Sequence, residues 1–130
     1  MILLDTNTLI HYIKGMQPVV SRLQASSPRE LAIPSVVAYE ILFGTLKAGS
    51  SSRRAVVAQL LAALRQVPFD SDAAQEAAGV RFDLESRGLV IGRMDLLIAG
   101  TALSRGSTLV TNNTRDFSRV RGLRLADWSK

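Results

Sequence analysis

Short apolar runs alternate with longer amphipathic segments along this chain, and that alternation most restricts the folds open to it. Most of the short runs are rich in aliphatic or β-branched residues, and several end at proline or at polar turn residues, as strands do. The predicted strands are residues 2–4, 30–34, 67–69, 107–113 and 123–128. Strands that alternate with helices favour a parallel sheet with helices on both faces. We therefore expect a three-layer α/β/α sandwich around a mainly parallel sheet, with 123–128 as an edge strand.

The segments between the strands carry helix signals. The clearest helix is 51–66, because the 3.6-residue period is followed by Val56, Val57, Leu60, Leu61 and Leu64. N-cap residue types at 5–8 predict a helix that continues through Ile13. Further helices are predicted over 18–26, 35–49, 71–87 and 92–106. Glycines stand where three of these helices should end, at Gly15, Gly88 and Gly106.

The length and composition are those of one ordinary globular unit. A chain of 130 residues suits a single domain, predicted to span 1–130, and 47% apolar residues are enough for a core. No apolar run approaches the roughly 18–20 residues that a membrane helix needs. The first residues lack a basic region and Asp5 interrupts their apolar run, so we expect no signal peptide. Without cysteine there are no disulfides or thiolate metal ligands, and a cytoplasmic location fits best.

The charge balance is typical of a protein with a polyanionic partner, although it also has a simpler explanation. The net charge is +5, and 13 of the 16 basic residues are arginine. Arginine pairs well with phosphate, so nucleic acid is one possible partner. The alternative is that the charge only keeps the protein in solution.

Two aspartates follow predicted strands, at the edge where ligands bind in open α/β sheets. Asp5 comes directly after "ILL", and Asp116 lies in the turn "TNNTRDF". Taken alone, each has a simple local role, Asp5 as a helix N-cap and Asp116 as a turn residue.

Two more acids occupy helix positions that rarely carry a charge. Glu40 shares a helical stripe with Val36 among bulky apolar neighbours, and Asp95 shares one with Ile98. A carboxylate on a packed face is costly unless it is paired or binds a cation. Each acid also has a local alternative: Glu40 faces water if the helix phase differs, and Asp95 serves the helix dipole or pairs with Arg93.

The predicted topology brings the four acids toward one end of the sheet. Converging carboxylates repel one another, and protonation moves to higher pH unless a cation is bound. Mg²⁺ takes oxygen ligands and usually needs only a few carboxylates beside substrate phosphate oxygens, and Mn²⁺ accepts a similar set. A single histidine, His11, and no cysteine argue against structural zinc.

Four stretches carry these acids: "ILLDTNTLIHYIKG", "IPSVVAYEILFG", "IGRMDLLIAGTAL" and "LVTNNTRDF". Together they span nearly the whole chain and resemble the motifs of PIN-domain ribonucleases, more narrowly of VapC-type toxins from bacterial or archaeal toxin–antitoxin pairs. The resemblance implies that Asp5, Glu40 and Asp95 form an acidic triad, with Asp116 as a more variable fourth acid. These acids would hold one or two Mg²⁺ or Mn²⁺ ions, and a metal-activated water would hydrolyse an RNA phosphodiester.

The resemblance also implies supporting residues and partners. Thr6 would flank the site and Asn113 would help to orient a ligand or water. The expected protein partners are a small VapB-like antitoxin and a second copy of the chain. Gly100 stands where many members of the family carry alanine, a difference that concerns local packing. RNA phosphates would be contacted by one or two of the nearby arginines Arg93, Arg115, Arg119, Arg121 and Arg124.

Two other functions fit part of the sequence. An aspartyl phosphotransferase would use Asp5 as its nucleophile. That chemistry commonly needs a second aspartate two residues later, where Asn7 stands, and a lysine near the phosphate, whereas lysine is scarce here. The other is an RNA- or protein-binding module with the same fold and no catalysis. Loss of one acid would favour such a module, and all four are present.

Overall fold

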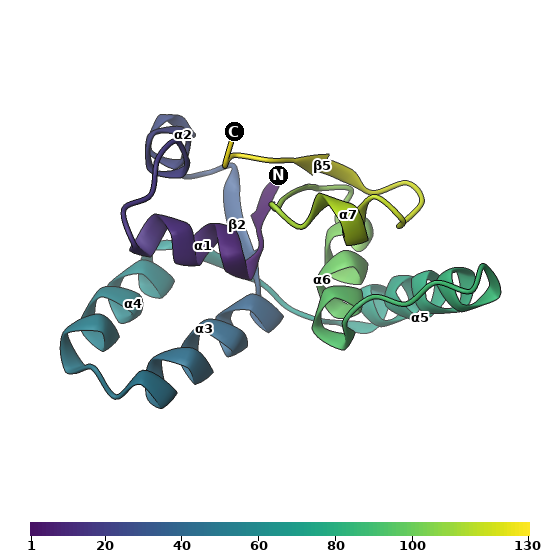
Figure 1. Ribbon diagram of the computed structural model, residues 1–130, viewed down its shortest axis with the longest axis horizontal. Coiled ribbons are helices and arrows are strands. Elements are labelled where there is room, and N and C mark those ends of the chain that lie inside the picture. Colours follow the sequence, from purple (N-terminus) through teal and green to yellow (C-terminus); the bar gives the residue numbers. More distant parts are fainter.

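The computed structural model describes residues 1–130, and its centre is one five-stranded sheet (Figure 1). Its strands are ordered β3-β2-β1-β4-β5, and every neighbouring pair is parallel. The predictions of a parallel sheet and of a final edge strand are therefore confirmed. The strands are β1 (Ile2–Leu4), β2 (Leu31–Pro34), β3 (Arg65–Val67), β4 (Thr108–Val110) and β5 (Arg124–Ala126).

Helices cover both faces of this sheet. They are α1 (Thr6–Ile13), α2 (Val19–Ala25), α3 (Ser35–Ala48), α4 (Ser51–Ala63), α5 (Ser71–Ser86), α6 (Arg93–Ser104) and α7 (Thr114–Phe117). The chain winds outward from β1 to β3 and then crosses back to β4 through α5 and α6. Because such crossovers are right-handed, the reversal places the later helices on the opposite face. Figure 1 shows α1–α4 on one side and α5–α7 on the other, the expected three-layer sandwich. None of the helices has both the length and the apolar character that crossing a bilayer requires.

The reversal of winding lies between β1 and β4. Leu4 pairs with Val110 in this parallel ladder, so Asp5 and Thr111 leave the sheet side by side. The backbone N–H of Asp5 still donates to the carbonyl of Val110 at 3.0 Å, which extends the pairing by one residue. Ligands in open α/β sheets bind beyond the carboxyl ends of the strands at this kind of position. The fold thus presents Asp5 where a site is expected.

The strands are short, and they are stabilised mainly by the burial of their side chains. Leu3, Leu4, Ala32, Ile33 and Leu109 are completely buried, because helices cover both faces of the sheet. Full burial of one large aliphatic side chain contributes about 1.5–3 kcal/mol. The central strands therefore provide a rigid base for the residues that follow them.

Two boundaries differ from the sequence prediction around β3. The helix predicted over 51–66 ends at Ala63, and the strand predicted at 67–69 lies at Arg65–Val67. Pro68 has no backbone N–H to donate, so the ladder with β2 stops before it. Only Val67 is common to the predicted and observed strands, because pairing with β2 rather than apolar character places Arg65 and Gln66 in β3.

Helix α3 packs a different stripe from the one expected. Its buried side chains are Val37, Ala38, Ile41 and Thr45, so the stripe that contains Glu40 lies beside the core and only half-buried. The outer face of α3 keeps four large side chains in solvent. Their exposed fractions are 60% for Tyr39, 48% for Leu42, 58% for Phe43 and 64% for Leu46. A helix that is apolar almost all round gives no periodic signal for which stripe packs.

Helices α5 and α6 pack so closely at Gly100 that no side chain fits there. A Cβ atom there would lie 2.6 Å from the Cβ of Ala77 and 2.7 Å from the carbonyl oxygen of Ala73. Real Cβ atoms do not approach other atoms so closely, so only glycine fits without a shift of one helix. This helix pair carries Asp95 on α6, and its spacing therefore affects the candidate site.

Candidate active site

Asp5 is a buried carboxylate with a hydrogen-bond donor on each oxygen. It follows β1 as the N-cap of α1, and its Oδ1 accepts from the backbone N–H of Thr8 at 2.9 Å. Its Oδ2 accepts from the side-chain hydroxyl of Thr111. Only 4% of the residue is exposed. The N-cap hydrogen bond thus uses one oxygen of Asp5. The other oxygen accepts from Thr111, which follows a different strand, β4.

Thr111 is a site residue that the sequence patterns did not single out. It is fully buried, follows β4 directly, and bonds through its hydroxyl both to Asp5 and to the backbone N–H of Asn113, the latter at 3.0 Å. A signal for it was present, because a polar residue immediately after a buried strand is also what marked Asp5. The pairing of the two positions follows only from the β1–β4 register.

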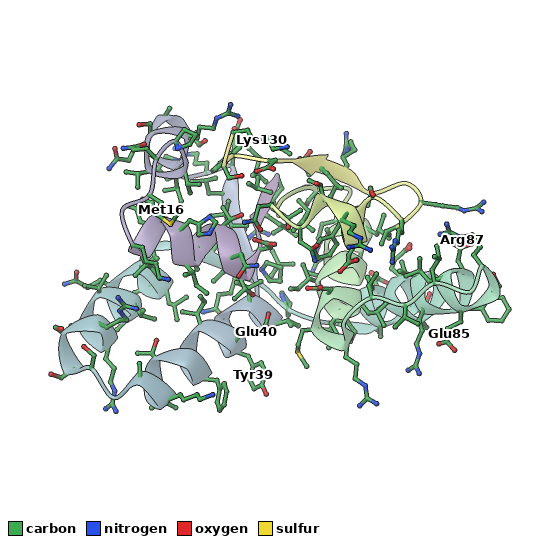
Figure 2. All side chains as sticks on the ribbon, in the orientation of Figure 1. Met16, Tyr39, Glu40, Glu85, Arg87 and Lys130 are labelled. Carbon is green, nitrogen blue, oxygen red and sulfur yellow. The ribbon has the colours of Figure 1, made fainter.

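Glu40 joins the site from α3. The hydroxyl of Thr6 donates to Glu40 Oε1 at 2.6 Å and so connects the first turn of α1 with α3. Figure 2 shows Glu40 pointing toward the middle of the molecule, whereas the neighbouring Tyr39 points outward. The structure therefore gives Thr6, predicted to flank the site, a definite bonding role.

Asp95 and Asp116 are brought together by Asn113. The Asn113 Nδ2 amide donates to Asp95 Oδ2 at 3.4 Å and to Asp116 Oδ2 at 3.3 Å. Asp95 lies in the first turn of α6, as predicted, whereas Asp116 lies in the short helix α7 and not in a turn. One side chain thus bridges two acids from different helices.

The four acids influence one another electrostatically. The pKa of Asp95 is raised to about 6, mainly by burial and then by the negative charges of Glu40, Asp5 and Asp116. Burial also raises the pKa of Asp5, and the hydrogen bonds from Thr111 and Thr8 oppose that rise. Asp5, Glu40 and Asp95 form no ion pair with any basic side chain. Of the four acids, only Asp116 lies near a basic side chain, that of Arg119 at 3.8 Å.

This donor set fits a hard divalent cation. All of its ligand atoms would be oxygens, and an ion would offset the burial and the neighbouring negative charges that raise the pKa of Asp95. No three acidic or histidine side chains are already close enough to form a finished metal cage. A bound ion would therefore draw the side chains closer or reach some of them through water, as Mg²⁺ commonly does.

Three of the predicted phosphate contacts lie on segments beside the acids. Arg93 begins α6, and both it and Arg115 of α7 are exposed and form no ion pair. Arg119 is half-buried: its Nη1 lies 3.8 Å from Asp116 Oδ1 and donates to the carbonyl of Val90 at 3.5 Å. Arg93 and Arg115 are therefore free to meet phosphate, whereas Arg119 is already engaged.

The expectation that Arg124 lies near the acids is wrong. It opens β5 opposite Thr108, at the amino end of the sheet, and donates to the carbonyl of Gly106. Arg121 is turned toward α5, with its Nε 3.6 Å from Asp83 Oδ2. Both arginines are close to Asp116 in sequence. The direction of β5 places Arg124 at the opposite end of the sheet, and the carboxylate of Asp83 attracts Arg121 toward α5.

A cleft of about 230 Å³ adjoins one of the acids. It lies between α1, α3 and α4, with Glu40 at its edge and Ile10, Ile13, Ile41 and Val57 in its walls. Lys14 and Arg53 also line it. A chain segment bound in this cleft would contact Glu40, the only one of the four acids that lines it.

The fold and the acid cluster match a known family. The family model of the PIN domain matches residues 2–123. The tRNA(fMet)-specific endonuclease VapC of Shigella flexneri is 37% identical, over 98% of this chain and 97% of that protein. Ribonuclease VapC2 of Rickettsia felis is 32% identical, over 98% of each.

Solved structures agree with these sequence matches. The crystal structure of DNA-bound VapBC from Salmonella typhimurium superposes with a TM-score of 0.90 at 34% identity, covering 98% of this chain and 97% of that chain. VapBC2 from Rickettsia felis, bound to a promoter DNA fragment, gives a TM-score of 0.89 at 32% identity, covering 98% and 99%. The fold is that of a PIN domain, and the chain belongs to the PIN-domain family, in its VapC group.

Proposed function

We propose that this chain is a divalent-metal-dependent endoribonuclease that acts as the toxin of a toxin–antitoxin pair. The observation that carries the proposal is the cluster of four carboxylates at the carboxyl end of the sheet. Burial, and then the charges of Glu40, Asp5 and Asp116, raises the pKa of Asp95 to about 6, and only Asp116 lies near a basic side chain, Arg119. Relatives similar over their full length and named ribonucleases or endonucleases support the same chemistry.

Asp5, Glu40 and Asp95 would hold one or two Mg²⁺ or Mn²⁺ ions, with Asp116 as the fourth acid. Such an ion, when bound, lowers the pKa of a coordinated water and offsets the charge of phosphate oxygens. Because that chemistry needs no side-chain base, His11 has no catalytic task in this proposal.

The other polar residues would keep the acids in position. The hydroxyl of Thr111 holds one oxygen of Asp5, and the hydroxyl of Thr6 holds one oxygen of Glu40. Asn113 fixes the spacing between the acids of α6 and α7. Ligand carboxylates fixed in this way lose less freedom when an ion binds.

The proposed substrate is RNA, and initiator tRNA is the first candidate to test. Relatives from Shigella flexneri and Salmonella typhimurium, 37% and 35% identical to this chain, are named tRNA(fMet)-specific endonucleases. The free guanidinium groups of Arg93 and Arg115 would contact phosphates near the scissile bond. RNA binding should then weaken steeply as salt is raised.

We also propose a VapB-like antitoxin and a second copy of the chain as partners. Solved relatives are VapBC complexes. Two uncovered surfaces support the proposal: the cleft beside Glu40, and the outer face of α3 with its four exposed large side chains. An antitoxin segment in the cleft would block the acids.

The test is cleavage of purified RNA by the purified chain with Mg²⁺ or Mn²⁺. We expect cleavage that EDTA abolishes and that Asp5→Ala and Asp95→Ala abolish while the protein stays folded. Asp72→Asn is a matched control, because Asp72 is an exposed acid in the first turn of α5, as Asp95 is an acid in the first turn of α6. Cleavage that survives EDTA would contradict the metal mechanism.

The alternative is a binding module with this fold and no catalysis. It predicts that the metal-loaded chain binds RNA or a protein partner at full strength and cleaves no RNA. Retention of all four acids and of their hydrogen-bond partners favours the enzyme.

A further inference from the structure

Arg87 connects the end of α5 with the segment that carries Asp116. Its Nη2 donates to the backbone carbonyl of Arg119 at 2.6 Å, across 32 residues of sequence. The same guanidinium donates to Asp83 Oδ2 from Nη2 at 2.6 Å and from Nε at 3.1 Å. The side chains of Arg87 and Asp83 are only 28% and 35% exposed, so water screens this pair less than a surface pair.

The backbone of Arg87 is itself fixed. Arg87 is the C-cap of α5, and Gly88 follows it in the left-handed conformation, with φ of 69°. The backbone N–H of Leu89 then donates to the carbonyl of Leu84 at 2.8 Å, which closes the helix end. Asp83 stands one turn before Arg87, the favourable order for an acid and a base on a helix. The guanidinium therefore reaches Arg119 from a rigid support.

The segment that Arg87 holds is anchored in the core at both ends. Phe117 is completely buried and Val120 is 4% exposed. The bond from Arg87 to the carbonyl of Arg119 lies between these two anchors, three residues after Asp116, and adds a polar contact that fixes the backbone there. A second hydrogen bond joins the same two segments. The Arg119 side chain donates to the carbonyl of Val90, which lies in the connection between α5 and α6.

We propose that Arg87 is a positioning residue of the active site, which orients Asp116 by holding the Arg119 carbonyl. The inference rests on the proposed function, because Asp116 would help to hold the metal ion. Arg87 touches neither the acids nor the place where substrate would bind. Removal of a partner that orients metal ligands typically lowers metal affinity or activity about 10–100-fold.

Arg81 provides a matched control on the same helix. It forms the same kind of pair, with its Nε donating to Glu85 Oε2 at 2.7 Å, but these side chains are 65% and 58% exposed. Figure 2 shows Glu85 and Arg87 on opposite sides of α5. Arg81→Ala therefore removes an arginine and an ion pair from α5 without touching α7.

The experiment measures Mn²⁺ affinity by calorimetry and RNA cleavage for the wild type, Arg87→Ala and Arg81→Ala. We expect Arg87→Ala to weaken Mn²⁺ binding about tenfold and to slow cleavage to a similar degree. Arg81→Ala should change neither. Unchanged Mn²⁺ affinity in folded Arg87→Ala would overturn the proposal.

A double substitution separates positioning from general loss of structure. In an Asp116→Asn background, Arg87→Ala should weaken Mn²⁺ binding much less than in the wild type, because the residue through which it acts is already gone. A full tenfold loss in that background would show that Arg87 does not act through Asp116.

Hydrogen exchange of the metal-free protein tests the contact without reference to activity. The backbone amides of Ser118, Arg119 and Val120 are bonded within the segment that Arg87 holds. They should exchange at least about tenfold faster in Arg87→Ala and not in Arg81→Ala. Unchanged exchange would overturn the positioning role. Faster exchange in a chain whose wild type binds no Mn²⁺ and cleaves no RNA would instead overturn the proposed function.

Discussion

Thr111 donates a hydrogen bond to Asp5, although 106 residues separate the two in sequence. The bond exists because β1 and β4 are neighbours in the sheet and both end at the same level. It opposes the burial that raises the pKa of Asp5, and so helps to keep a nearly inaccessible carboxylate ionised. A metal ligand in this position needs such support, since only the ionised form binds a cation well.

Thr111→Val should therefore impair the site with little change of shape. Without the hydroxyl, the pKa of Asp5 should rise further, and cleavage at neutral pH should fall about tenfold. The pH–rate profile checks this result, because the loss should shrink as pH is raised. Thr108→Val, at the other end of β4, serves as the control and should leave the profile in place. An equal loss at every pH would contradict the proposed role.

Cleavage should decline as pH is lowered through about 6, the raised pKa of Asp95. Below that value Asp95 carries a proton and is a poor ligand, so protons and metal compete for the same group. Rates measured from pH 5 to 8 at two Mn²⁺ concentrations test the idea, since more Mn²⁺ should move the decline to lower pH. A profile that stays flat down to pH 5 would rule out this competition.

Asp95→Asn should abolish cleavage and yet stabilise the metal-free protein. Because the pKa of Asp95 is raised above the usual 3.8, its stabilising contribution is complete below that pH and is lost as pH rises through about 6. The asparagine side chain stays uncharged at every pH, so the variant does not lose this stability as pH rises. After allowance for solvent screening of a half-buried group, we expect a gain of about 1 kcal/mol at pH 7.5, or about 3–5 °C in Tm.

Thermal unfolding with and without Mn²⁺ measures both sides of this prediction. Excess Mn²⁺ should raise the Tm of the wild type, because it binds only the folded chain, and should raise that of Asp95→Asn much less. The two metal-free proteins should converge in Tm as pH approaches 4. A variant less stable than the wild type at pH 7.5 would contradict the proposed cost of burying an ionised Asp95 among other acids.

Gly100→Ala should destabilise the protein by about 1–3 kcal/mol, because the added methyl group meets Ala77 and the backbone of Ala73. Gly79→Ala on α5 is the matched control. Its Cβ would have nothing within 4 Å, so it should stabilise the helix by about 0.5–1 kcal/mol. Urea unfolding of both variants checks the opposite signs. Two substitutions of equal effect would mean that the helices separate easily at Gly100.

The local patterns of the sequence determined the parallel sheet, the helix-ending glycines and the placement of acids after strands. Asp5 and Asp95 lie where these patterns predict, because caps and strand ends depend on neighbouring residues. Periodicity was a weaker guide to burial: α4 follows the helical period, yet Val57 is its only fully buried residue. A period shows that one face is apolar, but not how far other elements cover it.

Only the tertiary structure decided which residues complete the site. The contacts of Thr111 with Asp5, of Asn113 with Asp95 and of Arg87 with the Arg119 carbonyl join segments that are separate in sequence. Strand order, register and helix crossing set such contacts, and each is a balance over the whole core rather than a property of any one segment. The sequence by itself therefore determined which acids stand at the strand ends and helix starts, and the packing of the sheet and helices decided which side chains hold them in place.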